Sequence, residues 1–316
     1  MKKRLFLVSM AWFALLFTAG CPGSERRIFD RVAKKLRREP VISVYMADTG
    51  QKKRMGIEQY ITGVVAGEME KGWPINAYAA QAILVRTFTM EFLAGGGSRK
   101  QHGADISTEV EEAQAYNAAA ITPEIRRAVK MTRGKVITSN RMYIKGWFSA
   151  SCGGHTVPAK VGLAYKKPEP PYITPVGCPE DRVTPPPVKE WGATVTLDEI
   201  RAALMKMGRK VTAVTGIRPA GPKIYGRARD FEITIPGGKV KVPAADLRVA
   251  LGADKMRSIW FTSFKTENGK VAMKGKGFGH GVGLCQWGAY AYAKSGRSPE
   301  QIIRHYYPKT RIMTVW

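Results

Sequence analysis

Residues 56–93, GIEQYITGVVAGEMEKGWPINAYAAQAILVRTFTMEFL, contain the strongest secondary-structure pattern of this chain. Its first half predicts a helix that is ended by Gly72 and Pro74. Its second half begins at Ile75, is rich in helix formers with apolar residues at helical spacing, and stops at the glycine run 95–97. Two helices with so short a connection form a helical hairpin, which brings the end of the first helix close to the body of the second.

Regular elements are also predicted on both sides of the hairpin. Residues 41–45 predict a short strand, residues 98–120 a surface loop with little apolar content, and residues 123–140 a helix that ends near Gly134 and leads into a strand. The many prolines of residues 166–191 forbid a central strand, so we expect an extended surface excursion there and a candidate domain boundary.

The remaining segments predict a mixture of helices and antiparallel strands. Asn268 and Gly269 mark the turn of a hairpin, and Ser298 caps a last helix. The predicted fold class is α+β: a helical hairpin packed with mixed, mostly antiparallel β-structure. We expect one catalytic domain over residues 41–316, in which residues 165–245 form the proline-rich excursion and a smaller inserted α+β subdomain.

The start of the chain has the layout of an export signal. Three cations precede an apolar run that is too short to be a membrane span, and small residues follow. We therefore expect residues 1–21 to be an export or lipoprotein signal. The sequence TAGC resembles a lipoprotein cleavage box that would lipidate Cys21, and a plainly secreted (periplasmic) or membrane-anchored protein is the alternative. Residues 22–40 are a basic linker or a membrane-proximal helix.

The charge balance indicates an anionic partner. The chain has 51 Lys and Arg residues against 25 Asp and Glu, a formal net charge of +26. Nucleic acid is the usual partner of such a chain, but an export signal places the protein in the envelope, and no nucleic-acid motif is present. The expected partner is an anionic envelope surface and not a nucleic acid.

Two charged residues of the hairpin are candidate catalytic groups. Glu68 stands among apolar and small neighbours, and an apolar setting raises the pKa of a carboxyl and suits a general acid. Arg86 lies in an otherwise apolar helix, where a buried cation needs a carboxylate partner. Arg86 either orients Glu68 or forms a structural ion pair with the neighbouring helix.

Cysteines beyond the export signal allow several chemistries. Cys152 and His155 stand at metal-ligand spacing, and Cys178 follows downstream. These three would leave a zinc ion one ligand short, a position that Cys285 could fill. A disulfide, free thiols and a Cys/His nucleophilic pair stay open as alternatives.

A glycine-rich stretch lies near the end of the chain: GKGFGHGVGLCQWGAYAYAKSG, residues 275–296. It places polar side chains among residues that have no side chain. Gly279 and Gly281 allow another chain to approach closely, and His280 and Gln286 would project into that approach. These four residues are candidate substrate-binding residues, and structural support of the loop is the competing role.

Taken together, these segments resemble the stage II sporulation protein D family of cell-wall enzymes. The resemblance rests on the following stretches of the sequence: YITGVVAGEM, AYAAQAILVRT, AQAYN, TRGKVI, FSASCGGHT, the stretch from ADLRVALG to RSIWF, GFGHGVGLCQWGAYAYAKSG and IIRHYYP. They occur in family order over roughly residues 41 to 312.

This resemblance implies a peptidoglycan lytic transglycosylase. Such an enzyme cleaves glycan strands between N-acetylmuramic acid and N-acetylglucosamine, forms 1,6-anhydromuramic ends and prefers strands that lack stem peptides. The family's catalytic acid falls on Glu68 and its functional arginine on Arg86. Members with CGGHT look like zinc binders, so a structural zinc is expected at Cys152, His155 and Cys178, while catalysis requires no cofactor. The family also includes enhancers of cell-wall amidases, so an amidase is a candidate partner.

The single conspicuous carboxylate fits this chemistry. Ordinary glycosidases need two carboxylates. A lytic transglycosylase needs one, because the 6-hydroxyl of the muramic acid itself attacks the anomeric carbon.

Overall fold

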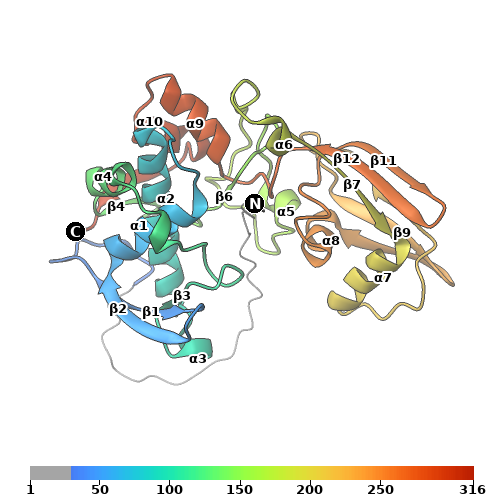
Figure 1. Ribbon diagram of the computed structural model, residues 1–316, viewed down its shortest axis with the longest axis horizontal. Helices are drawn as coiled ribbons and strands as arrows, with labels where there is room; N and C mark the ends of the chain where they lie inside the picture. The colour runs from blue at the N-terminus through green and yellow to red at the C-terminus, as the bar shows by residue number, and fades with distance from the viewer. Residues whose placement is uncertain (1–29) are drawn as a thin grey trace. The chain divides into compact units, whose positions relative to one another are not determined.

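The structure, a computed structural model, describes residues 30–316 and divides them into two compact units (Figure 1). We call residues 30–146, 297–303 and 309–316 the helical unit, and residues 147–296 and 304–308 the sheet unit. The predicted export signal, Cys21 and the first part of the basic segment lie outside the described residues. The expected start of the inserted subdomain at residue 165 falls inside the sheet unit.

The helical unit is built on α1 and α2, with two small three-stranded sheets beside them (Figure 1). Its helices are α1 (Ile57–Glu68), α2 (Ile75–Ala94), α3 (Arg99–His102) and α4 (Pro123–Met131). One sheet has the order β2-β1-β3 and consists of β1 (Val41–Met46), β2 (Gln51–Gly56) and β3 (Ile106–Ser107). The other has the order β14-β4-β5 and consists of β4 (Lys135–Ser139), β5 (Met142–Tyr143) and β14 (Arg311–Thr314).

The predicted hairpin is confirmed, but its first helix ends earlier than expected. Helix α1 stops at Glu68 and not near Gly72, because the chain turns into an extended conformation at Met69. The connection is held by the Tyr78 hydroxyl, which donates to the Glu70 carbonyl at 2.6 Å and accepts the Trp73 N–H at 3.0 Å. The early end makes Glu68 the last residue of the helix.

The prediction of a surface loop over residues 98–120 is wrong in part. Ile106 lies in β3, which pairs in parallel with β1 and is fully buried. Ala104 and Ala113 are also buried. The segment has few apolar residues, so no periodicity is visible in the sequence, but it inserts those few into the core of the helical unit.

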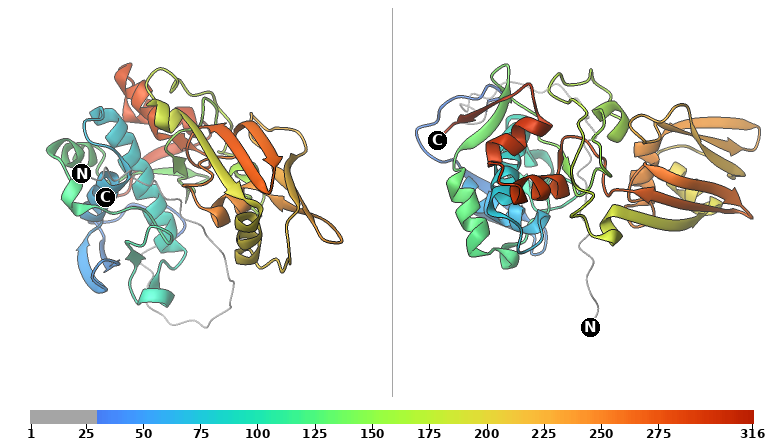
Figure 2. Two further views of the ribbon diagram at one scale, coloured as in Figure 1. Left: turned by 45° about the vertical axis from the view of Figure 1, so that its right-hand side comes forward. Right: turned by 90° about the horizontal axis from the view of Figure 1, so that it is seen from above.

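Antiparallel strands dominate the sheet unit, which Figure 2 shows from two further sides. One sheet contains β7 (Glu190–Thr196), β12 (Lys270–Lys276) and β11 (Phe261–Glu267), and another contains β8 (Gly216–Ala220), β9 (Asp230–Ile235) and β10 (Gly238–Pro243). A parallel pair is formed by β6 (Phe148–Ser149) and β13 (Leu284–Cys285). The helices are α5 (Ala159–Gly162), α6 (Pro186–Lys189), α7 (Leu197–Lys206), α8 (Ala244–Leu251) and α9 (Gln286–Lys294). The last helix of the chain is α10 (Pro299–Tyr306).

The hairpin turn predicted at Asn268 and Gly269 is confirmed in this unit. Glu267 pairs with Lys270 across the turn, where Asn268 and Gly269 have φ values of 48° and 72°, as a two-residue hairpin turn with two left-handed positions requires. The proline-rich segment, in contrast, ends in elements that were not predicted: the last prolines lie in α6, and β7 follows from Glu190 as an edge strand of its sheet. The α+β fold class is confirmed.

Candidate active site and cysteine cluster

Glu68 lies at the end of α1 with its side chain buried. Its side chain is only 5% exposed, and its Oε1 accepts a hydrogen bond from the Ala115 N–H at 2.8 Å. The segment that supplies this N–H belongs to the AQAYN stretch, residues 113–117. The carboxyl group is therefore removed from bulk solvent and is positioned by backbone from a distant part of the sequence.

Two glycines of α1 make this contact possible. Gly63 and Gly67 are one turn apart and lie on the same side of the helix. A Cβ atom on Gly63 would lie 2.2 Å from the ring of Tyr116, and one on Gly67 would lie 2.5 Å from the Ala115 carbonyl oxygen. The Asn117 N–H also donates to the Gly63 carbonyl at 2.9 Å. The absence of side chains at these two positions lets the 115–117 segment lie directly on the helix.

Burial changes the acidity of Glu68. Burial raises the pKa of its carboxyl to about 8, and the hydrogen bond from Ala115 opposes this rise. Burial also raises the pKa of the Tyr60 hydroxyl, and the negative charge of Glu68 raises it further. The ring of Tyr60 stacks on that of Tyr116, with centroids 5.8 Å apart. At neutral pH Glu68 is thus a protonated acid beside a pair of tyrosines.

Tyr116 also borders an open hollow in the surface of the helical unit. The hollow has a volume of about 790 Å³, which is in the range of small-molecule sites. It is lined by residues of β1, the turn that follows it, β2 and the 108–119 segment: Met46, Ala47, Asp48, Lys53, Thr108, Glu109, Val110, Glu111, Tyr116, Asn117, Ala118 and Ala119. Tyr116 therefore connects the surroundings of Glu68 with a concave surface.

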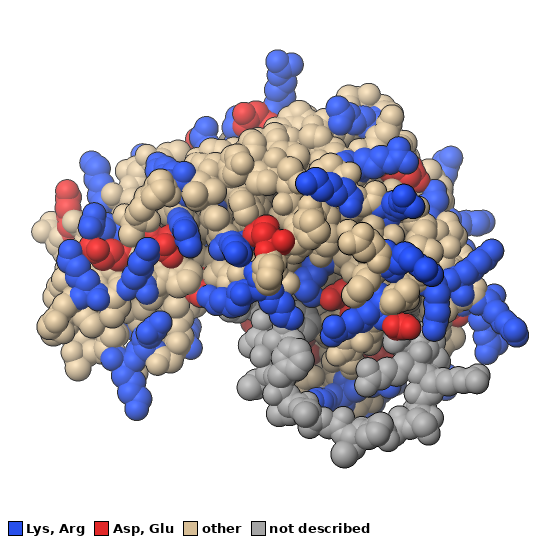
Figure 3. All heavy atoms as spheres, turned by 180° about the vertical axis from the view of Figure 1, so that it is seen from behind, with Lys and Arg blue, Asp and Glu red and all other residues tan. Residues whose placement is uncertain are grey.

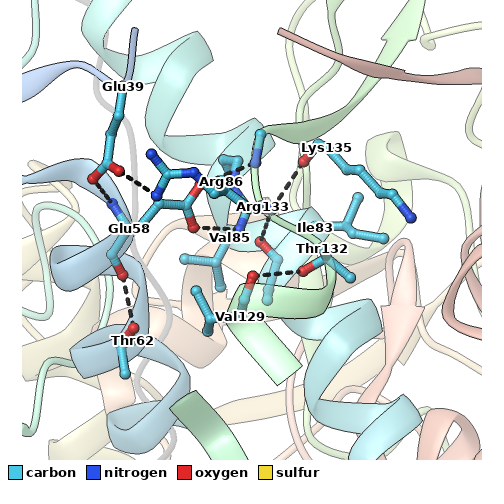
Figure 4. A network of polar contacts seen from close by, with 12 residues as sticks. Glu39, Glu58, Thr62, Ile83, Val85, Arg86, Val129, Thr132, Arg133 and Lys135 are labelled. Atoms are coloured by element: carbon cyan, nitrogen blue, oxygen red, sulfur yellow. Dashed lines mark hydrogen bonds and ion pairs between the residues drawn. The ribbon is translucent and has the colours of Figure 1, made fainter. Parts of the chain in front are cut away.

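Arg86 is held by a carboxylate other than Glu68. Its Nε and Nη2 donate to the two carboxylate oxygens of Glu58 at 3.0 and 2.6 Å, and its Nη1 donates to the Lys135 carbonyl at 3.0 Å (Figure 4). Glu58 lies in the first turn of α1, ten residues before Glu68, which corresponds to about 15 Å along the helix axis. The interpretation that Arg86 orients Glu68 is therefore corrected, and the alternative of an ion pair between the hairpin helices is what the structure contains.

This ion pair joins several distant segments of the helical unit. Arg86 is fully buried, and the Oε1 of Glu58 also accepts the Gly134 N–H and the Trp316 indole N–H, each at 3.0 Å. Bidentate geometry and additional N–H donors are what a buried ion pair needs in order to offset the loss of hydration. The pair thus ties α1 and α2 to the start of β4 and to the C-terminal residue.

The predicted substrate-binding residues of the glycine-rich stretch are buried within the sheet unit. His280 is 4% exposed and Gln286 is 2% exposed. The Nδ1 of His280 accepts the Val282 N–H at 2.9 Å. Burial lowers the pKa of His280 to about 3, with further contributions from Arg248 and Arg227. His280 is therefore neutral at physiological pH, and its burial favours the role of loop support over direct sugar binding.

The glycines beside His280 are required by close packing. Gly279 and Gly281 have φ values of +108° and +69°. A Cβ atom on Gly279 would lie 2.6 Å from that of Ser149, and one on Gly281 would lie 2.4 Å from Nη2 of Arg227. Glycine is therefore required at these positions by packing, because the loop lies directly against the buried guanidinium of Arg227.

Three cysteines of the sheet unit converge, and His155 is not among them. The Sγ atoms of Cys152, Cys178 and Cys285 lie within 4.8 Å of one another. The imidazole of His155 lies outside this group, stacked on the ring of Tyr225 with centroids 4.6 Å apart, and its Nδ1 is 2.7 Å from the Thr156 carbonyl oxygen. The structure thus brings Cys285 into the set predicted from the sequence and leaves His155 out of it.

A carboxylate that the sequence analysis did not consider lies against this cluster. Glu180 is 1% exposed, and its Oε2 lies 2.7 Å from Sγ of Cys285 while its Oε1 lies 3.6 Å from Sγ of Cys152. The only signal in the sequence is that Glu180 follows Cys178 by two residues in CPED. Glu58 and Tyr60 were also missed, because nothing in their spacing marks them as buried.

Among residues 30–316, no helix combines the length and the apolar character that crossing a bilayer requires.

Comparison with known proteins agrees with the resemblance found in the sequence. The profile described as "Stage II sporulation protein" matches residues 45–139, which include Glu68 and Arg86. An uncharacterized protein of Brachyspira hyodysenteriae is 30% identical over 256 residues; the match covers 80% of this chain, which spans 65% of that relative's length. Stage II sporulation protein D of Bacillus subtilis is 28% identical over 295 residues, with 89% of this chain and 81% of the relative covered. The amidase enhancer of B. subtilis is 26% identical over 292 residues, which cover 80% of this chain and 40% of that protein.

The chain is thus an α+β protein that carries a buried acid at the end of the first helix of a helical hairpin. These matches support the assignment of the chain to the stage II sporulation protein D family.

Proposed function

We propose that this protein is a peptidoglycan lytic transglycosylase that uses Glu68 as its only acid and base. The observation that carries the proposal is the buried Glu68 carboxyl, whose pKa is raised to about 8. A carboxyl that keeps its proton at neutral pH can protonate a leaving oxygen, which is the first requirement for cleaving a glycosidic bond.

The reaction needs one proton to move in each direction. Glu68 donates its proton to the glycosidic oxygen as the bond to C1 of the muramic acid breaks. The muramic 6-hydroxyl oxygen then bonds to C1, and its proton passes to the Glu68 carboxylate. The products are a free 4-hydroxyl on the glucosamine and a 1,6-anhydro ring on the muramic acid, and Glu68 returns to its protonated state.

The surroundings of Glu68 suit both stages of this cycle. Burial favours the protonated acid at the start, while the Ala115 N–H stabilises the carboxylate that exists after proton donation. The hollow bordered by Tyr116 offers a concave surface with an aromatic side chain, which suits the apolar face of a sugar ring. We place the glycan strand along this hollow.

The basic surface supports a location at the cell envelope. Lys and Arg side chains are distributed over the whole face shown in Figure 3, while Asp and Glu side chains are fewer. Glycan strands of the cell wall lie among anionic polymers, which attract a surface of this charge.

The test is digestion of glycan strands that lack stem peptides, followed by mass spectrometry of the products. The wild-type protein is expected to release fragments with 1,6-anhydromuramic ends, and Glu68→Gln is expected to lower the rate by about 10²- to 10⁴-fold. Glu70→Gln is the matched control, because Glu70 lies two residues away but is exposed. Products with reducing ends, or full activity of Glu68→Gln, would contradict the proposal.

Similarity to the amidase enhancer of B. subtilis favours a second candidate function. In that case the protein binds glycan and stimulates an amidase without cleaving the strand itself. The two candidates differ in their response to one substitution, since a non-catalytic enhancer tolerates Glu68→Gln. Stimulation by both the wild type and this variant, together with the absence of anhydro products, would favour the enhancer.

A further inference from the structure

The side-chain amide of Gln114, in the helical unit, is buried without a hydrogen-bond partner. Gln114 is 3% exposed, and neither its Oε1 nor its Nε2 has a partner among the described residues. An amide in this state is costly, because folding removes it from water and gives it no hydrogen bond in exchange. Native proteins contain few such groups, and each one calls for an explanation.

Gln114 directly precedes the residue that holds the candidate acid. The N–H of Ala115 donates to Oε1 of Glu68 at 2.8 Å. Two covalent bonds join this nitrogen to the Cα atom of Gln114, and standard backbone dimensions place the two atoms about 2.4 Å apart. The Cα atom of Gln114 therefore lies within about 5.2 Å of the Glu68 carboxyl oxygen. A glutamine side chain has a similar length, so its amide can reach the carboxyl group.

The backbone on both sides of Gln114 is fixed. Ala113 is buried on one side. On the other side, Gly63 and Gly67 let the segment that follows Gln114 lie on α1, where the Asn117 N–H donates to the Gly63 carbonyl at 2.9 Å. The amide of Gln114 can therefore change its partner by rotation of its side chain, without movement of the backbone that positions Glu68.

The proton cycle of Glu68 creates a need for a neutral donor. In the resting protein the carboxyl is protonated at neutral pH, because burial raises its pKa to about 8. Once Glu68 has lost its proton, both oxygens carry negative charge in a buried setting, where hydrogen bonds to the ionised form stabilise it. A neighbouring cation would keep the carboxyl ionised at every stage, whereas a neutral amide does not.

Three tyrosines lie on the elements next to Glu68: Tyr60 of α1, Tyr78 of α2 and Tyr116 of the 108–119 segment. Burial raises the pKa of all three hydroxyls, so they stay neutral over the pH range in which Glu68 titrates. The buried cation of α2, Arg86, is bound by a carboxylate at the other end of α1, and Glu70 is exposed. An amide donor thus suits the electrostatics of this site.

We infer that Gln114 is a positioning residue whose amide N–H donates a hydrogen bond to the Glu68 carboxylate while Glu68 lacks its proton. When the proton of the muramic 6-hydroxyl passes to Glu68, this hydrogen bond is released and Gln114 returns to the arrangement seen in the structure. The catalytic part of this role rests on the proposed function. The hydrogen bond itself needs no substrate, because Glu68 also loses its proton when the pH is raised.

The test is a carbon-13 NMR titration of the full chain, labelled at the side-chain carboxyl of glutamate, with Glu68→Gln to identify the resonance of Glu68. In the wild type this carboxyl is expected to titrate near pH 8. In Gln114→Met it should titrate at least about one pH unit higher, because the ionised form loses a donor. Gln59→Met is the matched control, since Gln59 is an exposed residue of α1, and should leave the pKa of Glu68 unchanged. An unchanged pKa in Gln114→Met would overturn the inference.

Thermal unfolding at pH 6 separates this role from a structural one. At that pH Glu68 is protonated and the amide of Gln114 is unpaired, so an apolar side chain of similar shape should keep or raise the Tm. A Tm of Gln114→Met below that of the wild type would show that the amide supports the fold, and would contradict the positioning role.

Kinetics on glycan strands without stem peptides measure the catalytic consequence. Gln114→Met should lower kcat for the release of anhydro fragments by about 10- to 100-fold and leave KM unchanged, because Gln114 acts on Glu68 and not on the glycan. A raised KM with an unchanged kcat would overturn the positioning role. If the pKa of Glu68 rises in Gln114→Met but the wild type releases no anhydro fragments, the hydrogen bond is supported and the proposed function fails.

Discussion

The two ends of helix α1 carry buried glutamates with opposite surroundings. Glu58, in the first turn, lies against the Arg86 guanidinium and accepts two further N–H groups, those of Gly134 and the Trp316 indole. Glu68, at the last position, accepts the Ala115 N–H, and burial raises its pKa to about 8. Glu58 therefore has a structural role, because a cation compensates its charge. Glu68 is held by a backbone N–H instead, and its raised pKa suits proton transfer.

The largest effect on the free energy of unfolding is expected from a substitution at the Glu58 end of α1. Arg86→Met leaves the Glu58 carboxylate buried opposite a neutral side chain, so the free energy of unfolding should decrease by about 3–5 kcal/mol. Chemical denaturation of the wild type and the variant measures this difference. If the ion pair is purely structural, the variant should still release anhydro products at temperatures at which it is folded.

The double variant Glu58→Gln/Arg86→Met is the control for this comparison. Replacing both charges of a buried ion pair costs less than removing one of them, so the double variant should be more stable than Arg86→Met alone. A loss of activity in the folded Arg86→Met protein would contradict the division of roles between the two ends of α1.

The pH dependence of glycan cleavage tests the role of the Glu68 carboxyl. The active acid is the protonated carboxyl, so kcat/KM should be constant below its pKa of about 8 and should fall about tenfold for each pH unit above it. Because no second carboxylate must be ionised, no acidic limb is expected between pH 5 and 7. Initial rates on glycan strands without stem peptides measure the profile, and a bell-shaped curve centred in the acidic range would contradict it.

The stability of the protein offers a check that does not depend on the substrate. The pKa of Glu68 is higher in the folded state than in the unfolded state. The stability that this difference contributes is fully present below pH about 4.5 and is lost as the pH rises through about 8. Glu68→Gln has no proton to lose, so its Tm should exceed that of the wild type increasingly as the pH rises over this interval.

The smallest effect is expected at the exposed edge of the Glu58 network. Nη1 of Arg133 lies 2.6 Å from Oε2 of Glu39 (Figure 4), but the side chain of Arg133 is 52% exposed. An exposed ion pair contributes less than about 1 kcal/mol, so Arg133→Ala should change the free energy of unfolding by no more than this. A loss as large as that of Arg86→Met would show that burial is not what separates the two arginines.

Sequence reasoning was most successful where local patterns decide the structure. The apolar spacing of the hairpin predicted both of its helices, and Asn268 with Gly269 predicted a hairpin turn. It was weaker where a few residues of an irregular segment enter the core, as Ile106 and Ala113 do. Glu68 was singled out by its apolar neighbours, and the structure buries it among them.

Pairing between distant residues was the part that could not be predicted. The sequence showed that Arg86 needs a carboxylate but could not distinguish Glu58 from Glu68, because both lie on the partner helix of the hairpin. It likewise placed Cys152 beside His155 through their short spacing, whereas the fold brings Cys152 to Cys285, 133 residues away, and adds Glu180.

Local sequence patterns were enough to predict a hairpin of two helices, one acid in an apolar setting, one buried cation and a set of thiols. Which of these groups contact one another became known from the folded chain alone. The physical reason is that helix and turn formation depends on neighbours within a few residues, whereas a buried charge or a sulfur finds its partner through the packing of segments that are far apart in the chain.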